Sequence, residues 1–409
     1  MKRTLSVRLH GVPIGILEEN DGTLEFKYLP DAKRLLSLSL PLQEKVFRGT
    51  VCNAYFGGLL PESETVRKLL GRRFGINSNN TFSLLAAIGL DCAGAVSFHE
   101  PDAAVKEDAN FHLQAKILSD EELEKHITSL PLPPILEGTD EIRLSLAGVQ
   151  EKTAVCLIDN KVALPIGGCP TTHILKPASN VFPELIENEY LCLKAAKAVG
   201  IDVPHIEIGQ VNGLKYFLIE RYDREITDNK IKRIHQEDFA QALGFPASQK
   251  YEQEEGPGFK DCFNLINKFS VPAVDKIKFI ERAVFNYLIG NTDAHSKNFS
   301  LLHYDNGMIQ FAPAYDILCT MAYEKHSEWM AMKIGNTIRI SAVKKTDWEE
   351  FSTNVGFRYK GIEETLKTQS EKLPSVIEKE SQNLKDKGYS GVIGEKILKY
   401  AEKSCSKMR

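Results

Sequence analysis

The stretch that decides the fold runs from residue 290 to residue 301 and reads Gly290-Asn291-Thr292-Asp293-Ala294-His295-Ser296-Lys297-Asn298-Phe299-Ser300-Leu301. It follows an apolar run with helical spacing, 279–289, and leads into a short β-prone segment, 299–303. Its Asp-x-His-x-x-Asn pattern holds a carboxylate, Asp293, and an amide, Asn298, on one loop. Such a carboxylate can accept the hydrogen bond of an attacking hydroxyl, and such an amide can ligate Mg²⁺ on a nucleotide.

A second element, Ala314-Tyr315-Asp316-Ile317-Leu318, follows the strand-like residues 308–311. Asp316 stands where kinases place the aspartate that bridges metal to phosphate. Taken alone, Asp293 could equally cap a helix end and Asp316 could start a turn, because aspartate is common in both places. Taken together, the two elements favour phosphoryl transfer.

The composition of the 409-residue chain is that of an ordinary soluble globular protein, with 43% hydrophobic and 26% charged residues and a net charge of −4. The length suffices for two or three domains. The charge balance argues against a nucleic-acid binder that acts mainly through its net charge. The first residues alternate like a strand and lack a signal peptide, and no apolar run could span a bilayer. We therefore expect a cytoplasmic protein without membrane contact.

The eight cysteines contain no Cys-x-x-Cys pair and mostly sit in apolar or helical contexts. A disulfide framework or a zinc site is not indicated by this pattern. The cysteines are expected to be buried, reduced thiols.

The first third of the chain reads as a small β-rich domain. Short strands are predicted within 1–30 and at 94–98, and helices at 60–74 and 80–88. Charged and small residues then dominate from 100 to 108, which predicts a linker. The first domain is therefore placed at residues 1–105.

A strand–loop–strand pattern follows the predicted helix 119–129 and the stiff connector 131–134. Strands at 142–146 and 153–158 flank a loop that could meet phosphate with its backbone N–H groups. Its single glycine makes it no Gly-x-Gly-x-x-Gly motif. Hydroxyl, amide and ammonium groups near its tip come from Ser145, Gln150 and Lys152.

A lysine, Lys176, ends the next predicted strand and precedes a predicted helix, 183–199, whose first turns carry Glu187 and Glu189. Kinases pair such a strand lysine with a helix glutamate, and this chain's pair is expected to be Lys176 and Glu189. Two further strands flank the turn signal Asn212-Gly213 and end in Glu220-Arg221-Tyr222-Asp223-Arg224. That run is expected to be the hinge between lobes, where an adenine would meet backbone groups.

The remainder of the chain turns helical. Helices are predicted at 239–243, 261–269, 274–289, 347–353, 358–372 and 392–403, and the basic tail 403–409 is expected to be mobile. The second domain is placed at 106–222, as a kinase N-lobe with phosphate loop and hinge, and the third at 223–409, as a helical C-lobe. This is the α+β layout of a two-lobed kinase.

The motifs resemble, in order, those of the HipA family, the toxin kinases of bacterial toxin–antitoxin modules. The matching stretches are Leu59 to Ser63, Ser145 to Ala154 as the phosphate loop, Pro170 to Lys176, Glu220 to Arg224, Gln236 to Asp238, Asn291 to Ser300, and Tyr315-Asp316. They run through most of the chain, so their order is more specific than any one motif.

The resemblance implies a serine/threonine protein kinase of HipA-like fold that uses ATP and Mg²⁺. Asp293 would be the catalytic base, Asn298 and Asp316 the metal ligands, and Ser145 the autophosphorylated serine whose phosphate switches the kinase off by expelling the loop. The residues expected to bind ATP are Ala147, Gly148, Val149, Gln150, Glu151, Lys152, Lys176, Glu220, Tyr222, His295, Lys297, Asn298 and Asp316. The implied partners are a HipB-like DNA-binding antitoxin, with DNA reached only through it, and glutamyl-tRNA synthetase as protein substrate.

Three alternatives stay open at the level of sequence. His295 is interpreted as a support for the loop and not as a proton carrier, since Asp-x-His-x-x-Asn also occurs in aminoglycoside and lipid kinases. The loop motif would permit a small-molecule kinase. A catalytically silent protein that serves its antitoxin as a DNA-bound co-repressor is the alternative outside the enzymes.

Overall fold

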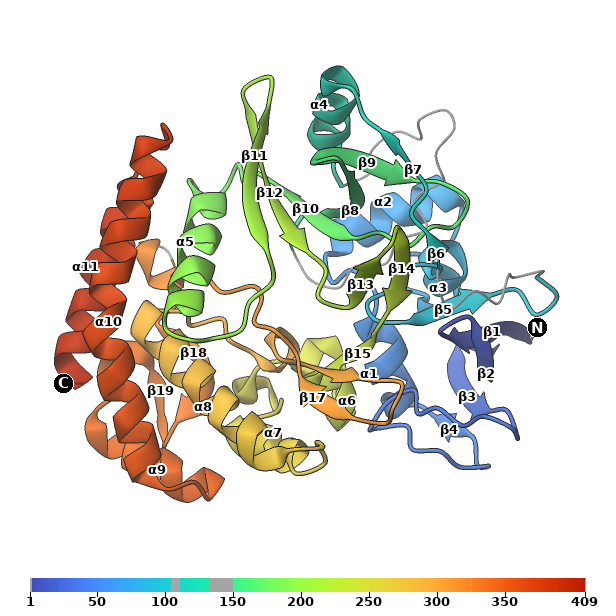
Figure 1. The fold of residues 1–409 in the computed structure, drawn as a ribbon. Helices are drawn as coiled ribbons and strands as arrows, with labels where there is room; N and C mark the ends of the chain where they lie inside the picture. Colours follow the sequence, from blue (N-terminus) through green and yellow to red (C-terminus); the bar gives the residue numbers. More distant parts are fainter. Residues whose placement is uncertain (1, 104–110, 132–149, 325, 409) are drawn as a thin grey trace. The chain divides into compact units, whose positions relative to one another are not determined.

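The structure is a computed structural model that describes residues 2–103, 111–131, 150–324 and 326–408 (Figure 1). Contacts between residues divide the chain into two units. Unit 1 comprises Met1–Pro177, Gly209–Ser248 and Leu302–Gly307; unit 2 comprises Ala178–Ile208, Gln249–Leu301 and Met308–Arg409. Each unit thus joins segments distant in sequence, whereas the predicted three-part division follows the chain in order and stays a prediction.

Unit 1 opens with a five-stranded antiparallel sheet in the order β4-β3-β2-β1-β5. Its strands are β1 (Arg3–Leu9), β2 (Val12–Asn20), β3 (Thr23–Tyr28), β4 (Phe47–Arg48) and β5 (Val96–His99). The alternation that predicted these strands reflects one buried face, with Leu5, Val7 and Leu9 all buried. Gly15 on β2 is required by packing, because a Cβ there would lie 2.4 Å from the ring of Phe26.

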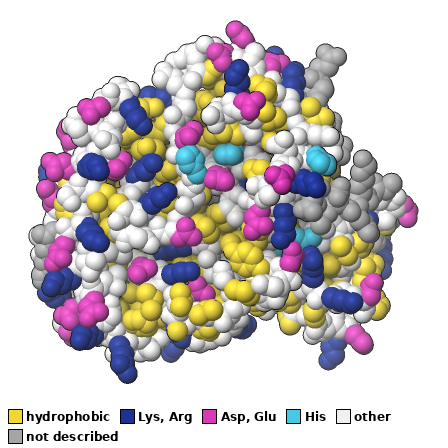
Figure 2. Space-filling view, viewed as in Figure 1, with side chains coloured by type: hydrophobic (Ala, Val, Ile, Leu, Met, Phe, Trp, Pro, Cys, Tyr) yellow, Lys and Arg dark blue, Asp and Glu magenta, His cyan; other side chains and the backbone are white. Residues whose placement is uncertain are grey.

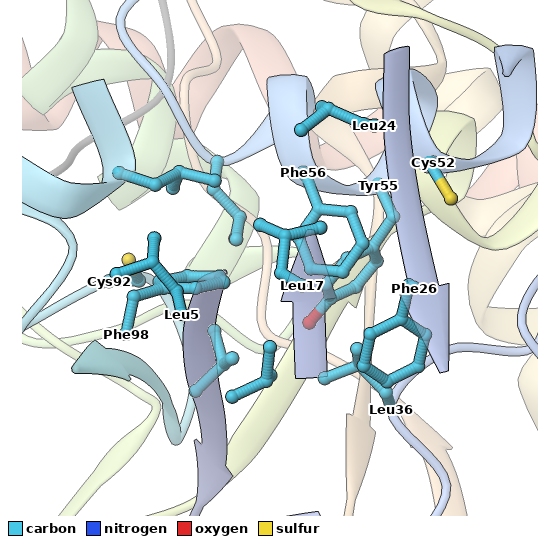
Figure 3. Close-up of a cluster of buried hydrophobic side chains, with 14 of the residues drawn as sticks. Leu5, Leu17, Leu24, Phe26, Leu36, Cys52, Tyr55, Phe56, Cys92 and Phe98 are labelled. Carbon is cyan, nitrogen blue, oxygen red and sulfur yellow. The ribbon is translucent and has the colours of Figure 1, made fainter. Parts of the chain in front are cut away.

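Three helices pack with this sheet: α1 (Thr50–Gly58), α2 (Glu64–Phe74) and α3 (Thr81–Ile88). Ser63 caps α2 by accepting the amide of Val66 at 3.4 Å, and Asn80 caps α3 by accepting the amide of Ser83 at 2.7 Å. Figure 3 shows the resulting core, in which Phe56 of α1 lies next to Leu17 of β2. Its ring centroid is 5.5 Å from that of Phe26.

A second, six-stranded sheet has the order β11-β12-β10-β8-β9-β7. Its strands are β7 (Ala115–Ile117), β8 (Thr153–Ile158), β9 (Lys161–Pro165), β10 (His173–Pro177), β11 (Ile206–Val211) and β12 (Leu214–Glu220). Asp159 and Asn160 both have positive φ, as a two-residue hairpin turn between β8 and β9 requires. The helix α4 (Asp120–Thr128) contributes Leu123 and Ile127 to the core of this sheet.

The rest of unit 1 is a small three-stranded sheet, β13-β14-β6, and the segment that follows it. The elements are β6 (Phe111–His112), β13 (Arg224–Thr227), β14 (Lys230–Arg233), β15 (His235–Asp238) and α6 (Phe239–Leu243). Asp238 and Gln241 form a reciprocal capping box at the start of α6.

Unit 2 is mostly helical. Its helices are α5 (Leu185–Ala198), α7 (Phe259–Ile266), α8 (Pro272–Ile289), α9 (Lys345–Val355), α10 (Tyr359–Asp386) and α11 (Val392–Met408), with short 3-10 turns η2 (Glu252–Glu254), η3 (Ser296–Asn298), η4 (Thr320–Ala322) and η5 (Ile340–Ala342). The 3-10 turn η1 (Ala247–Gln249) begins in unit 1 and ends at the first residue of this segment of unit 2. The short strands are β16 (Ser300–His303), β17 (Ile309–Phe311), β18 (Trp329–Ile334) and β19 (Thr337–Arg339). α10 packs along α5, α8 and α11, and α10 and α11 run side by side (Figure 1).

Two predictions about the C-terminal helices are wrong. The tail 403–409, expected to be mobile, continues α11 to Met408, because Cys405 and Met408 extend the buried face of the helix and Ser404 Oγ donates to Leu288 O at 2.6 Å. The helix predicted to end at residue 372 continues to Asp386 past Pro374. Packing of Ile377 and Leu384 outweighs the local helix-breaking effect of proline.

All eight cysteines are buried free thiols, as predicted. In the described part of the chain no helix is both long and apolar enough to cross a membrane. Acidic and basic side chains are interspersed over the face shown in Figure 2, as a net charge of −4 in 409 residues would suggest.

Candidate active site

The loop 290–300 begins where α8 ends. Gly290 closes the helix in the left-handed conformation, with φ of 81°, and the amide of Asn291 returns to Asn286 O at 2.8 Å. A Cβ at residue 290 would lie 2.6 Å from the ring of Tyr400, so packing as well as backbone conformation requires glycine. The glycine cap of α8 therefore fixes where the loop starts.

The hydroxyl of Thr320 holds the next residues of the loop. It accepts the amide of Thr292 at 2.9 Å and donates to Gly290 O at 3.0 Å. From β18, the amide of Ala331 donates to Thr292 O at 2.8 Å. Three segments of unit 2 thus meet at Thr292, one residue before the predicted base.

Asp293 and Asn298 are brought together by the fold of the loop itself. Asn298 Nδ2 donates to Asp293 O at 3.0 Å, and the amide of His295 donates to the same oxygen at 2.9 Å. This use of Nδ2 leaves Asn298 Oδ1 as the side-chain atom that could ligate a cation. The two residues are half-buried, whereas His295 and Lys297 between them are each only 6% exposed.

The carboxylate of Asp293 has a partner that the sequence did not reveal. Tyr251 Oη donates to Asp293 Oδ1 at 2.8 Å, and the Tyr251 ring meets the ring of His295 edge to face at 5.4 Å. The interpretation of His295 as a support for the loop fits this contact and its backbone bonds, and the role stays a prediction.

Asp316 lies on a segment tied to the loop and to α5. The hydroxyl of Tyr315 donates to Lys297 O at 2.7 Å, one residue before Asn298. On the other side, the amide of Asn188 exchanges two hydrogen bonds with the backbone of Cys319, at 2.8 and 3.0 Å. Asp316 itself has φ of 56°, a left-handed conformation that aspartate tolerates better than most residues and that is found preferentially at functional sites.

Lys176 and Glu189 are both buried on regular elements, at 4% and 1% exposure. Lys176 lies on β10 of unit 1, opposite Phe217 of β12, and Glu189 lies on α5 of unit 2. Burial of a lysine and a glutamate is costly unless each is paired or hydrogen-bonded. Both residues therefore have the environment expected of groups with a specific task.

The predicted hinge follows β12 directly. The amide of Arg221 donates to Thr172 O at 2.9 Å, which continues the pairing of β12 with the start of β10. Tyr222 Oη donates to Gln236 Oε1, and Glu220 at the end of β12 is half-buried.

A largely buried charge cluster holds the segment predicted to be the hinge, and we call it the Asp91 cluster; its members are Asp91, Arg221, Asp223, Arg224 and Arg233. Asp91 Oδ1 accepts Arg224 Nη2 at 2.7 Å, and Asp91 Oδ2 accepts Arg221 Nη1 at 3.4 Å. The same oxygen accepts the amide and hydroxyl of Thr171, at the start of β10. One carboxylate of the N-terminal sheet region thereby holds both the hinge and the strand that carries Lys176.

The arginines of the cluster lower the pKa values of its two carboxylates. Burial alone would raise the pKa of Asp91, but Arg221, Arg224 and Arg233 hold it well below the ordinary range. Burial likewise works against Asp223, and Arg221 and Arg224 nonetheless lower its pKa to about 2. Both carboxylates are therefore ionised at neutral pH.

Two family models match this chain. The family model described as the HipA-like C-terminal domain matches residues 144–377, and the one described as the HipA N-terminal domain matches residues 5–99. The chain belongs to the HipA family of toxin kinases.

Two relatives and one solved structure illustrate this membership. The protein Y4mE of Sinorhizobium fredii, named as a kinase, is 41% identical over 87% of this chain and 86% of its own length. The serine/threonine-protein kinase toxin HipA of Shewanella oneidensis is 29% identical over 91% of this chain and 88% of its own. A structure of the HipA–HipB–operator DNA complex from Shewanella oneidensis MR-1 matches with a TM-score of 0.83, 28% identity, and coverage of 98% of this chain and 97% of that one.

These matches confirm the predicted fold class, an α+β, HipA-like kinase fold with a small β-rich N-terminal region and a mostly helical C-terminal part. Membership in the family also places the chain among kinases of toxin–antitoxin systems.

The predicted site residues fall into three groups in the structure. Asp293, Asn298, His295, Lys297 and Asp316 belong to one connected part of unit 2, and Lys176, Glu220 and Tyr222 to unit 1. Gln150, Glu151 and Lys152 precede β8, with Glu151 exposed. Ser145, Ala147, Gly148 and Val149 lie outside the described residues, as does the predicted strand 142–146.

The side chains of Asn298 and Asp316 suit a Mg²⁺–nucleotide. Asn298 and Asp316 offer one amide and one carboxylate, both hard oxygen ligands, and Mg²⁺ is commonly held by one or two such groups together with substrate phosphates and water. Across the described residues there is no group of three or more His, Cys, Asp or Glu side chains that could hold a metal without such help.

Proposed function

We propose that this chain is an ATP- and Mg²⁺-dependent serine/threonine protein kinase and the toxin of a toxin–antitoxin module. The observation that carries the proposal is the hydrogen bond from Asn298 Nδ2 to Asp293 O, which keeps a base and a metal ligand on one rigid loop. The tie from Tyr315 to Lys297 O supports it, because that tie keeps Asp316 with the same loop.

In the proposed reaction, Asp293 accepts the proton of a serine or threonine hydroxyl as that oxygen attacks the γ-phosphorus of ATP and ADP leaves. Asn298 and Asp316 would hold Mg²⁺, which neutralises phosphate charge when bound. Lys176 would orient the α- and β-phosphates, with Glu189 holding the lysine. His295 and Lys297 would complete the nucleotide site next to Asn298.

The remaining nucleotide contacts are proposed for the phosphate loop and the hinge. Ala147, Gly148, Val149, Gln150, Glu151 and Lys152 would meet the phosphates, and Glu220 and Tyr222 the adenine. Ser145 is proposed as the autophosphorylated residue. A phosphate there would be repelled by the phosphates of ATP, which would move the loop away and switch the kinase off.

The proposed partners are a HipB-like antitoxin, DNA through that antitoxin, and glutamyl-tRNA synthetase as substrate, all in the cytoplasm. The similar Shewanella protein was solved with HipB and operator DNA, which supports the first two.

Label transfer from γ-labelled ATP tests the assignment of roles. Asp293→Asn should lower transfer at least about a thousandfold while it still binds Mg²⁺–ATP in calorimetry, because only the base is lost. Asp316→Asn should weaken Mg²⁺–ATP binding at least about tenfold, because a metal ligand is lost. The matched control is Asp386→Asn at the exposed end of α10, which should behave as wild type. Full transfer by Asp293→Asn would remove the assigned base.

A further inference from the structure

The segment 249–258 of unit 2 contacts the loop 290–300, which we call the catalytic loop, through Tyr251. Its hydroxyl donates to Asp293 Oδ1 at 2.8 Å. Within the described part of the chain, Asp293 Oδ1 takes this bond and no side chain or amide donates to Oδ2. The carboxylate therefore has one oxygen engaged and one available.

The segment is fixed to the loop at a second point, the backbone of Lys250. Ser296 Oγ donates to Lys250 O at 3.3 Å, and the ring of Tyr251 packs against that of His295. Tyr251 is therefore held through the backbone of its neighbour Lys250 and through its own ring, both by residues of the loop.

β18 fixes the same segment from outside the loop. The amide of Lys333 donates to Glu252 Oε2 at 2.7 Å, and Gln253 Nε2 donates to Met330 O at 3.3 Å. β18 also bonds Thr292 O through the amide of Ala331. The strand thus holds the Tyr251 segment and the catalytic loop in one frame.

Tight folding of the segment sets where the tyrosine lies. The amides of Glu254 and Gly256 both donate to Tyr251 O, at 2.9 and 3.0 Å. A Cβ at residue 256 would lie 2.2 Å from Gln249 O, so only glycine fits this close turn. The tyrosine is consequently a built-in part of the site.

We propose that Tyr251 is a positioning residue that orients the Asp293 carboxylate and presents its Oδ2 to the substrate hydroxyl. This inference rests on the proposed function, in which Asp293 is the base. Rotation of an aspartate carboxylate about its last bond is loosely restricted, so a third group is needed to fix it. A fixed carboxylate raises the fraction of bound states in which the hydroxyl, the base and the phosphorus are aligned.

Tyr251→Phe tests this role, since it removes the hydroxyl and keeps the ring that contacts His295. The measurement is the rate of self-phosphorylation as a function of Mg²⁺–ATP concentration, with phosphate located by peptide mass. The rate at saturating ATP should fall at least about tenfold, and the half-saturating ATP concentration should stay within about twofold of wild type. Tyr359→Phe, in a half-buried tyrosine at the start of α10, is the control and should match wild type.

A double-mutant cycle tests the contact without relying on activity. Tyr251→Phe and Asp293→Ala, singly and together, should change the unfolding equilibrium constant non-additively, by a factor of at least about five. Additive effects would overturn the inference.

The outcomes separate this inference from the proposed function. Full activity in Asp293→Asn, or none in wild type, would overturn the proposed function itself. A dead Asp293→Asn with an unchanged saturating rate in Tyr251→Phe would overturn only the role of Tyr251. A raised half-saturating ATP concentration with an unchanged rate would show a merely structural role, and phosphate found on Tyr251 would make it an acceptor; either result would overturn the inference.

Discussion

The Asp91 cluster and the loop 290–300 both hold irregular backbone in place, the first with charged groups and the second with neutral groups. In the cluster, two carboxylates pair with three guanidinium groups and offset most of their positive charge. In the loop, the fixing contacts at Thr292 are hydroxyl and backbone groups without charge.

The difference is explained by what each region leaves available. Both carboxylates of the Asp91 cluster are paired with arginines. The pKa values of Asp91 and Asp223 are low because these arginines are positively charged. Neutral groups hold the loop in place, and among the described residues the Asp293 carboxylate accepts one side-chain hydrogen bond, from the hydroxyl of Tyr251. The carboxylates that hold the fold together thus lie in the Asp91 cluster, and the carboxylate proposed for chemistry, Asp293, lies elsewhere.

The largest effect is expected from breaking the cluster. Asp91→Ala leaves three buried arginines with one carboxylate fewer, and removal of one partner from a buried ion pair costs about 3–5 kcal/mol. Urea unfolding should show this loss. Asp305→Asn, an exposed ion-pair residue with Lys232 and Arg34, is the control and should leave the midpoint nearly unchanged. A midpoint equally unaffected by Asp91→Ala would contradict the structural role of the cluster.

A smaller effect is expected from the neutral contacts of the loop. Thr320→Val keeps the side-chain shape but leaves the buried amide of Thr292 without its acceptor, which should cost about 1–3 kcal/mol. Transfer activity should fall as well, because the proposed base, Asp293, is the next residue. Thr353→Val, an exposed helix hydroxyl on α9, should change neither quantity. If Thr320→Val retained stability and activity, the loop would owe its shape to other contacts.

The smallest effect is expected from acid titration of Asp223, measured as the change in the free energy of unfolding between pH 4 and 2.5. The pKa of Asp223 is lowered from its ordinary value to about 2, so its contribution to stability is fully present above about pH 4 and is lost as the pH falls toward 2. At neutral pH this contribution is about 2 kcal/mol. The free energy of unfolding of Asp223→Asn should therefore fall less steeply between pH 4 and 2.5 than that of wild type. Parallel curves would show that Asp223 does not titrate in this way.

The sequence predicted the elements that depend on residues close together in the chain. The hairpin at Asn212-Gly213, the helix that ends at Gly290 and the spacing of Asp293 and Asn298 are short-range patterns, and they predicted these elements with small errors at the ends. The helix α1 was missed, because its two glycines near the end weaken the helical signal.

Partners distant in sequence left no such signal. Asp91 and Arg221 are 130 residues apart, and Tyr251 and Asp293 are 42 apart. The charged residues in the run from Glu220 to Arg224 could be read from the sequence. That Arg221 and Arg224 contact the carboxylate of Asp91 could not. Tyr251 stood among glutamates and glycines in a stretch without periodicity, so its contact with Asp293 is seen only in the folded chain.

The most direct test of the central claim, that Asp293 is the base of a kinase that modifies itself, compares wild type with Asp293→Asn by intact and peptide mass after incubation with Mg²⁺–ATP. One phosphate on Ser145 is expected in wild type and none in the variant. Phosphate in both proteins, or in neither while both still bind ATP, would contradict it.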